Sequence, residues 1–122
     1  MDCEETVNRY FGKNSRMSVS VTEDIAGVAV ILSGSLDLNS SSALQEMLIY
    51  IIGSMAGHKR LLIDLNDVSY IPSSGVGALT IALTTARKRD IKLQLSRIQP
   101  KVRSVFELLG FMSFFEEVRY DA

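Results

Sequence analysis

Two adjacent serines, Ser73 and Ser74, have the setting that most favours chemistry in this chain of 122 residues. They follow an apolar run and precede the glycine-rich stretch "GVGAL", a pattern that predicts a strand leading into a helix. A hydroxyl at the start of a helix can accept a hydrogen bond from a free backbone N–H, which is a structural role. The same amides and the positive end of the helix dipole would also favour a phosphate on that oxygen. The residues alone leave both interpretations open.

The serine pair does not fit the pattern of a serine hydrolase. A nucleophile elbow has the form G-x-S-x-G and needs a histidine base, whereas the order here is Pro72, Ser73, Ser74, Gly75. His58 is the only histidine, and a solvated loop position in "GHKR" explains it better than catalysis does. We therefore predict a protein that is not an enzyme and has no catalytic residue.

Cofactor and metal sites are also not indicated. The stretch "GVGALT" matches a dinucleotide fingerprint only weakly, because Thr80 stands where Gly or Ala is expected and Asp90 is too near to be the ribose ligand. No P-loop lysine follows the glycines. Asp64, within an apolar strand, could be a metal ligand but is more typical of a residue that caps a neighbouring turn. We predict no cofactor and no metal.

Composition narrows the partners and the compartment. Thirteen basic and fourteen acidic residues give a net charge of -1, so no global field attracts nucleic acid or an anionic membrane. The only cysteine, Cys3, has no mate within the chain, which is compatible with a reducing compartment. The first ten residues are acidic and lack the apolar segment of a signal peptide. We expect a cytoplasmic protein that binds neither nucleic acid nor membrane.

The elements that would position the serines begin with two strands and a helix. Residues 18–23 alternate with period two and residues 27–34 are rich in β-formers, which predicts an edge strand and a central strand. From Ser40 to about Met55 the apolar residues form one helical stripe. Ser42 and Gln45 have the spacing of a capping box at its start.

Two further strand and helix pairs follow. Residues 60–65 and the segment up to Pro72 predict a buried strand, and the residues after Ser74 predict a helix that ends in a basic cluster. Residues 91–96 alternate as a strand, and Pro100 opens a third helix. The order ββαβαβα predicts a single α/β domain, with helices packed on a mixed sheet.

Residues 1–16 form a polar lead-in to this domain. A short helix there would place Val7, Tyr10 and Phe11 on one side.

Three stretches together resemble a known family. They are "ILSGSLDLNSSSALQEML", "LLIDLNDVSYIPSSGVGAL" and "IQPKVRSVFELLGFMSFFEEV", and they resemble the STAS domain, in particular the stand-alone bacterial anti-sigma factor antagonists. The resemblance runs from about Ser18 to Val118, which places the STAS domain at residues 17–122 after the lead-in.

The resemblance implies a switch in partner binding. In such proteins the unphosphorylated form binds an anti-sigma factor, which is also a serine kinase of the histidine-kinase-like ATPase type, and so frees a sigma factor. Phosphorylation releases the kinase, and a serine phosphatase resets the cycle. The alternative is a STAS module of another assembly, such as a stress-signalling scaffold, a regulator of secretion or motility, or a subunit of a lipid transporter.

The resemblance also implies site residues. The phospho-acceptor of the family motif D-S-[ST]-G corresponds to Ser73, and "GSLD" matches the family's G-x-[IL]-D, so that Asp37 would lie close to the acceptor. Asp37 could equally cap the turn that follows it. The implied partner-binding residues are Leu36, Asp37, Asn39, Ser74, Gly75, Val76 and Gly77.

The chain departs from the family before the acceptor. Pro72 stands where the family usually carries aspartate, so any help from that carboxylate is absent. Proline instead fixes φ and stiffens the approach to Ser73. A phosphate on Ser73 would repel acidic neighbours and would have to be desolvated before a partner docked, so binding would be lost while the fold remained intact.

Overall fold

The computed structural model describes residues 1–12 and 16–119, and this part of the chain forms a two-layer α/β domain. A five-stranded sheet has the order β1-β2-β3-β4-β5, in which β1 is antiparallel to β2 and the other neighbours are parallel. The strands are β1 Met17–Asp24, β2 Gly27–Ser35, β3 Arg60–Tyr70, β4 Lys92–Ser96 and β5 Glu116–Val118. The predicted α/β class and mixed sheet are confirmed.

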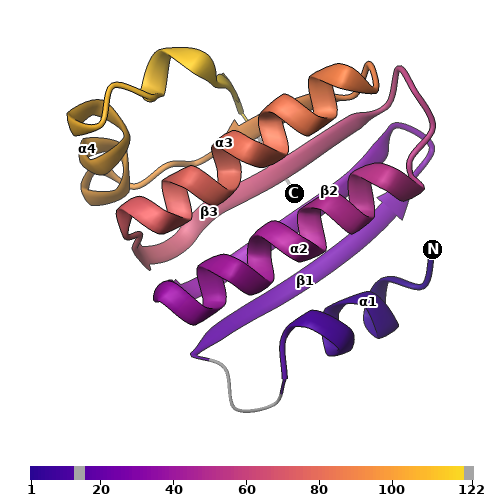
Figure 1. The fold of residues 1–122 in the computed structure, drawn as a ribbon, viewed down its shortest axis with the longest axis horizontal. Coiled ribbons are helices and arrows are strands. Elements are labelled where there is room, and N and C mark those ends of the chain that lie inside the picture. Colours follow the sequence, from indigo (N-terminus) through magenta and orange to yellow (C-terminus); the bar gives the residue numbers. More distant parts are fainter. Residues whose placement is uncertain (13–15, 120–122) are drawn as a thin grey trace.

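The helices are α1 Cys3–Tyr10, α2 Leu38–Ser54, α3 Ser73–Lys88 and α4 Pro100–Leu108, and a 3-10 helix, η1, covers Met112–Phe114. α2 and α3 lie side by side over one face of the sheet, and both begin at the same end of the molecule (Figure 1). The predicted order ββαβαβα is present, with α1 before it and with η1 and β5 after it. Within the described residues, no helix is both long and apolar enough to span a bilayer.

The core forms where the apolar patterns of the elements meet. β3 has consecutive buried residues, so both of its faces are covered, as expected for a central strand of a parallel sheet. The apolar stripe of α2 is buried as predicted, and small residues of α3 are buried beside it. The stripe consists of Leu44, Met47, Leu48, Ile51 and Ile52, and the small residues of α3 are Ala78, Ala82 and Ala86. These small side chains let α3 pack closely.

Helix α2 begins earlier than the predicted capping box. The carboxylate of Asp37 accepts the N–H of Ser40 at 2.8 Å, and the Ser40 hydroxyl accepts the N–H of Asp37 at 2.8 Å. The box predicted at Ser42 and Gln45 is therefore wrong. Asp37 stands where the chain leaves β2, and its side chain satisfies the first free amides before Ser42 is reached.

The lead-in contains α1, which packs on β1 and α2. Asp2 caps the helix by accepting the N–H of Glu5 at 3.0 Å. Phe11 is buried, and Val7 and Tyr10 are half-buried against the core. These three residues thus share the core-facing side of the lead-in.

Candidate functional site

Ser73 is the first residue of α3, and its side chain is exposed. The residue that precedes the helix is Pro72, whose carbonyl accepts the N–H groups of Gly75 at 2.9 Å and of Val76 at 3.2 Å. No side chain caps this helix, so of the two interpretations left open for the serines, the structural one, a serine N-cap, is wrong. Pro72 already holds the extended conformation that an N-cap requires, so the helix starts one residue too early for a serine cap. The hydroxyl of Ser73 is consequently open to solvent at the positive end of the α3 dipole.

Ser74 is half-buried and faces α2. Its hydroxyl donates to the Ser41 hydroxyl at 3.3 Å, and the Ser41 hydroxyl donates to the carbonyl oxygen of Asp37 at 2.7 Å. Ser41 itself is buried. This chain of hydroxyls joins the first turn of α3 to the first turn of α2.

Asp37 is exposed, and its carboxylate has a structural role. Its Oδ1 accepts the N–H of Ser40 at 2.8 Å and the Ser40 hydroxyl at 3.0 Å. These hydrogen bonds, followed by one from Asn39 and the charge of Arg16, hold the pKa of Asp37 below its ordinary value. The predicted cap is confirmed, whereas contact of Asp37 with a partner stays a prediction.

Three of the predicted partner-binding residues have side chains or Cα positions inside the protein. Leu36 is 2% exposed and Val76 0%, and Gly75 is buried. A Cβ added to Gly75 would lie 2.7 Å from Cγ1 of Ile71 and 3.3 Å from Cδ2 of Leu36. These residues therefore support the surface from below and cannot offer side chains to a partner without rearrangement.

The remaining predicted residues are accessible at the common end of α2 and α3. Sequence reasoning missed Leu38, which is 71% exposed at the first position of α2. Its signal was an apolar residue that lies outside the helical stripe beginning at Leu44. We call this surface the docking surface, and it consists of Asp37, Leu38, Asn39, Ser73, Ser74 and Gly77.

Hydrogen bonds join the ends of β2 and β3 below the docking surface. The N–H of Leu36 donates to the carbonyl of Tyr70 at 3.1 Å, and the Ser69 hydroxyl donates to the carbonyl of Gly34 at 3.3 Å. These bonds hold the ends of β2 and β3 together where the strand register shifts near Ser35. The starts of α2 and α3 are thereby placed at a fixed separation.

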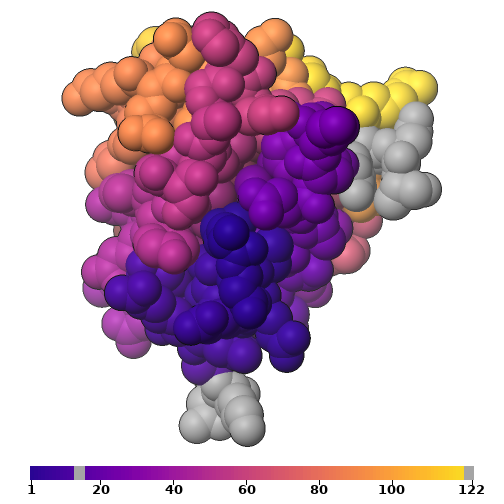
Figure 2. Space-filling model, turned by 90° about the vertical axis from the view of Figure 1, so that its right-hand side faces the viewer, coloured from indigo at the N-terminus to yellow at the C-terminus, as the bar shows by residue number. Residues whose placement is uncertain are grey.

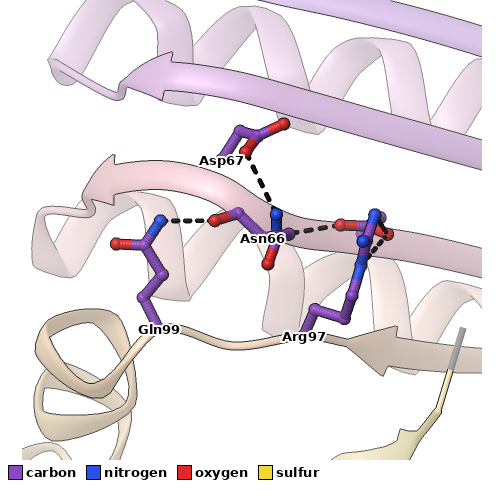
Figure 3. A network of polar contacts seen from close by, with 5 residues as sticks. Asn66, Asp67, Arg97 and Gln99 are labelled. Carbon is purple, nitrogen blue, oxygen red and sulfur yellow. Dashed lines mark hydrogen bonds and ion pairs between the residues drawn. The ribbon is translucent and has the colours of Figure 1, made fainter.

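A second polar cluster joins β3 to the segment between β4 and α4 (Figure 3). Arg97 donates to Oδ2 of the buried Asp64 through Nε at 2.9 Å and Nη2 at 2.6 Å, and the Asn66 N–H donates to Oδ1 of Asp64 at 2.8 Å. Gln99 donates to the Asn66 carbonyl, and the Asn66 side chain donates to Asp67 at 3.1 Å. Asp64 thus bonds a backbone amide within β3, where the register against β2 shifts, and the neighbouring turn that it was predicted to cap is absent.

No group of three or more His, Cys, Asp or Glu side chains that could hold a metal ion occurs in residues 1–12 and 16–119. His58 is exposed in the loop before β3 and has φ 67°. It lies beyond the C-terminal end of α2, whereas Ser73 lies at the end where α2 and α3 begin.

Two named relatives share part of this sequence. The chain is 36% identical over 59 residues to BtrV of Bordetella bronchiseptica, named as an anti-sigma factor antagonist; the match spans 48% of the chain and 51% of BtrV, about half of that relative's length. It is 25% identical over 100 residues to the anti-sigma-B factor antagonist of Bacillus subtilis strain 168, covering 82% of the chain and 89% of that protein.

Solved structures share the fold. An anti-sigma factor antagonist from Mycobacterium paratuberculosis superimposes with a TM-score of 0.72 at 21% identity, covering 83% of this chain and 84% of the other. The antagonist SpoIIAA in its unphosphorylated form gives a TM-score of 0.70 at 19% identity, covering 83% and 88%. The family model of the STAS domain matches residues 16–121. This match spans most of the sequence, and the chain therefore belongs to the STAS domain family.

Proposed function

We propose that the protein is a phospho-switched anti-sigma factor antagonist of the cytoplasm, without enzymatic activity of its own. Its unphosphorylated form binds an anti-sigma factor that is a serine kinase of the histidine-kinase-like ATPase type, and so releases a sigma factor. Phosphorylation of Ser73 ends this binding, and a serine phosphatase restores it. The observation that carries the proposal is the exposed Ser73 hydroxyl at the open end of α3, beside the capped start of α2.

Phosphorylation at this position would alter the surface and leave the fold in place. The Ser73 side chain caps nothing, so its esterification breaks no capping bond. The phosphate would sit at the positive end of a helix of 16 residues, where the dipole and free amides stabilise an anion. A group with charge near -2, as expected for a phosphoserine at neutral pH, would repel acidic groups of a partner and resist desolvation. Binding is therefore the property that changes.

The neighbours of Ser73 offer no evident base for the phosphoryl transfer. Pro72 replaces the aspartate that the family usually carries at this position. Asp37, with its lowered pKa, is ionised at neutral pH and is a weak base. The group that takes the proton from the Ser73 hydroxyl therefore comes from the kinase.

Phosphorylation in vitro tests the acceptor directly. The purified chain is incubated with ATP and each purified histidine-kinase-like serine kinase encoded in the same genome, and mass spectrometry then locates the phosphate. We expect one phosphate on Ser73 and none in Ser73→Ala. Phosphate on another residue, or on none with every such kinase, contradicts the proposed acceptor.

Calorimetric titration with the same kinase tests the switch. Ser73→Asp should bind at least about tenfold more weakly, because it places a negative charge in the docking surface. Thr84→Asp is the matched control, since Thr84 is exposed on the same helix but far from its start. Equal affinity of Ser73→Asp and the parent would refute the switch. Stable binding to a transporter or scaffold in place of any kinase would favour the alternative STAS module.

A further inference from the structure

We propose that α1 and the start of α2 extend the docking surface into a groove that receives a segment of the same anti-sigma factor. This inference rests on the proposed function and adds to it a second contact region outside the serine switch. The groove has a volume of about 310 Å³. The residues of this α1–α2 groove that carry the argument are Tyr10, Phe11, Arg16, Asp37, Asn39 and Ala43.

One wall of the groove belongs to a segment that precedes the matched STAS domain. α1 covers Cys3–Tyr10, whereas the family match begins at residue 16. The helix is held firmly, since the rings of Tyr10 and Tyr50 lie 6.0 Å apart and the Arg9 guanidinium lies 5.5 Å from both ring centroids. Figure 2 shows α1, in indigo, packed on the body of the domain at the surface of the molecule. The wall is thus a built feature of this chain.

The groove is continuous with the docking surface. Asp37 and Asn39 line the groove and also belong to the docking surface. The carbonyl of Asp37 is joined to the start of α3 through the hydroxyls of Ser41 and Ser74. A partner that covers Ser73 and Asp37 therefore meets the mouth of the groove in the same contact.

The charges at the groove indicate what the partner segment must carry. The exposed carboxylate of Asp37 and the exposed guanidinium of Arg16 both line the groove, and neither belongs to an ion pair within the part of the chain that the structure describes. Tyr10, the last residue of α1, offers a half-buried ring in the same groove. The complementary segment presents a basic or amide donor to Asp37, a carboxylate to Arg16 and an apolar side chain to Tyr10.

Two variants test the groove by calorimetric titration with the kinase that phosphorylates Ser73. Arg16→Glu reverses an exposed charge and should weaken binding about tenfold or more, because the new carboxylate would face the carboxylate of the partner segment. Ala43→Leu fills the groove at a half-buried helix position and should weaken binding by a similar factor. Lys92→Glu is the control, since it makes the same charge change on an exposed side chain at the first residue of β4.

The outcomes separate the groove from the switch. Thermal unfolding of each variant shows whether it is folded. If Ala43→Leu does not fold, Arg16→Glu still tests the groove, because its side chain is exposed. Parent-like affinity of Arg16→Glu, with weak binding of Ser73→Asp, would overturn the groove and leave the switch standing. Weak binding of Arg16→Glu, with parent-like affinity of Ser73→Asp, would support the groove and refute the switch. Equal weakening by Lys92→Glu would show a general charge effect and overturn the groove.

Discussion

The Ser74 hydroxyl lies 3.3 Å from the hydroxyl of Ser41, although the two serines are 33 positions apart in the sequence. The Ser41 hydroxyl in turn donates to the carbonyl of Asp37 at 2.7 Å. The residue after the proposed phospho-acceptor is thus tied to the residue that caps α2. We expect a substitution at the start of one helix to affect the start of the other, because residues in one hydrogen-bond network are energetically coupled.

Ser41→Ala tests this connection. The change removes a buried hydroxyl, its bond to the Asp37 carbonyl and the acceptor of the Ser74 hydroxyl. We expect the free energy of unfolding to fall by about 1 kcal/mol, the usual net value of such a hydrogen bond. Urea unfolding measures it, with Ser42→Ala as the control because Ser42 is exposed beside it. Equal stability of the two variants would mean that the hydroxyl chain does not stabilise the domain.

The ion pair of Asp64 and Arg97 should matter more than the second ion pair among the described residues. The Asp64 side chain is 1% exposed, so Arg97→Ala leaves a buried carboxylate without its ion-pair partner. We expect a loss of about 1–3 kcal/mol in the free energy of unfolding, because the Asn66 N–H still reaches one oxygen. Arg103→Ala breaks the pair with Glu117, whose side chains are 35% and 37% exposed, and should cost at most about 1 kcal/mol. Denaturant unfolding of both variants checks the order, and a larger cost for Arg103→Ala would contradict it.

The cap at Asp37 predicts a dependence of stability on pH. Its pKa in the folded protein is lower than in the unfolded chain, so its contribution is complete above the unfolded value of about 3.9. The contribution is lost as the pH falls through the lower, folded pKa, because protonation weakens the bonds from Ser40. Asp37→Asn keeps a cap that does not titrate, and its unfolding free energy should fall less between pH 6 and pH 3, conditions chosen to span about the unfolded pKa. Parallel curves for the parent and Asp37→Asn would contradict this assignment.

The repeating parts of the fold were predictable from the sequence, and so was the start of α4 at Pro100, whereas the starts of α2 and α3 were not. The stripe from Leu44 to Ile52 follows helical spacing and is buried as that spacing requires. The start of a helix depends on where the chain leaves the preceding strand, and spacing does not reveal this. For that reason Asp37 caps α2 in place of Ser42, and Pro72 precedes α3 in place of a serine.

The site was predictable as two neighbouring loops but not as a surface. Short motifs placed Asp37 and Ser73 at the ends of successive parallel strands, which meet at one edge of a sheet. The motifs could not show that Leu36 and Val76 point inward, because both residues belong to the motifs and also to the buried core. The short strand β5 was also missed, since the polar stretch "EEV" pairs only because β4 offers it a free edge.

Gly75 and Gly77 offer a matched pair for testing how tightly the docking surface rests on the core. A Cβ at Gly75 would lie 2.7 Å from the Ile71 side chain, whereas a Cβ at Gly77 meets nothing within 4 Å. Gly75→Ala should therefore lower the free energy of unfolding by about 1–3 kcal/mol, the usual cost of overpacking. Gly77→Ala should be neutral or raise it by up to about 1 kcal/mol, because alanine favours a helix over glycine.

Urea unfolding of the two glycine variants measures both changes in stability. Titration with the kinase measures whether Gly75→Ala also lowers the affinity. If Ile71 and Leu36 moved aside freely, Gly75→Ala would gain stability as Gly77→Ala does, and this result would contradict a rigid support. Because the first turn of α3 rests on that contact, Gly75→Ala should also displace Ser73 and Ser74 and weaken binding. The loss of binding then needs no new charge in the docking surface, which separates a displaced helix from the charge effect of Ser73→Asp.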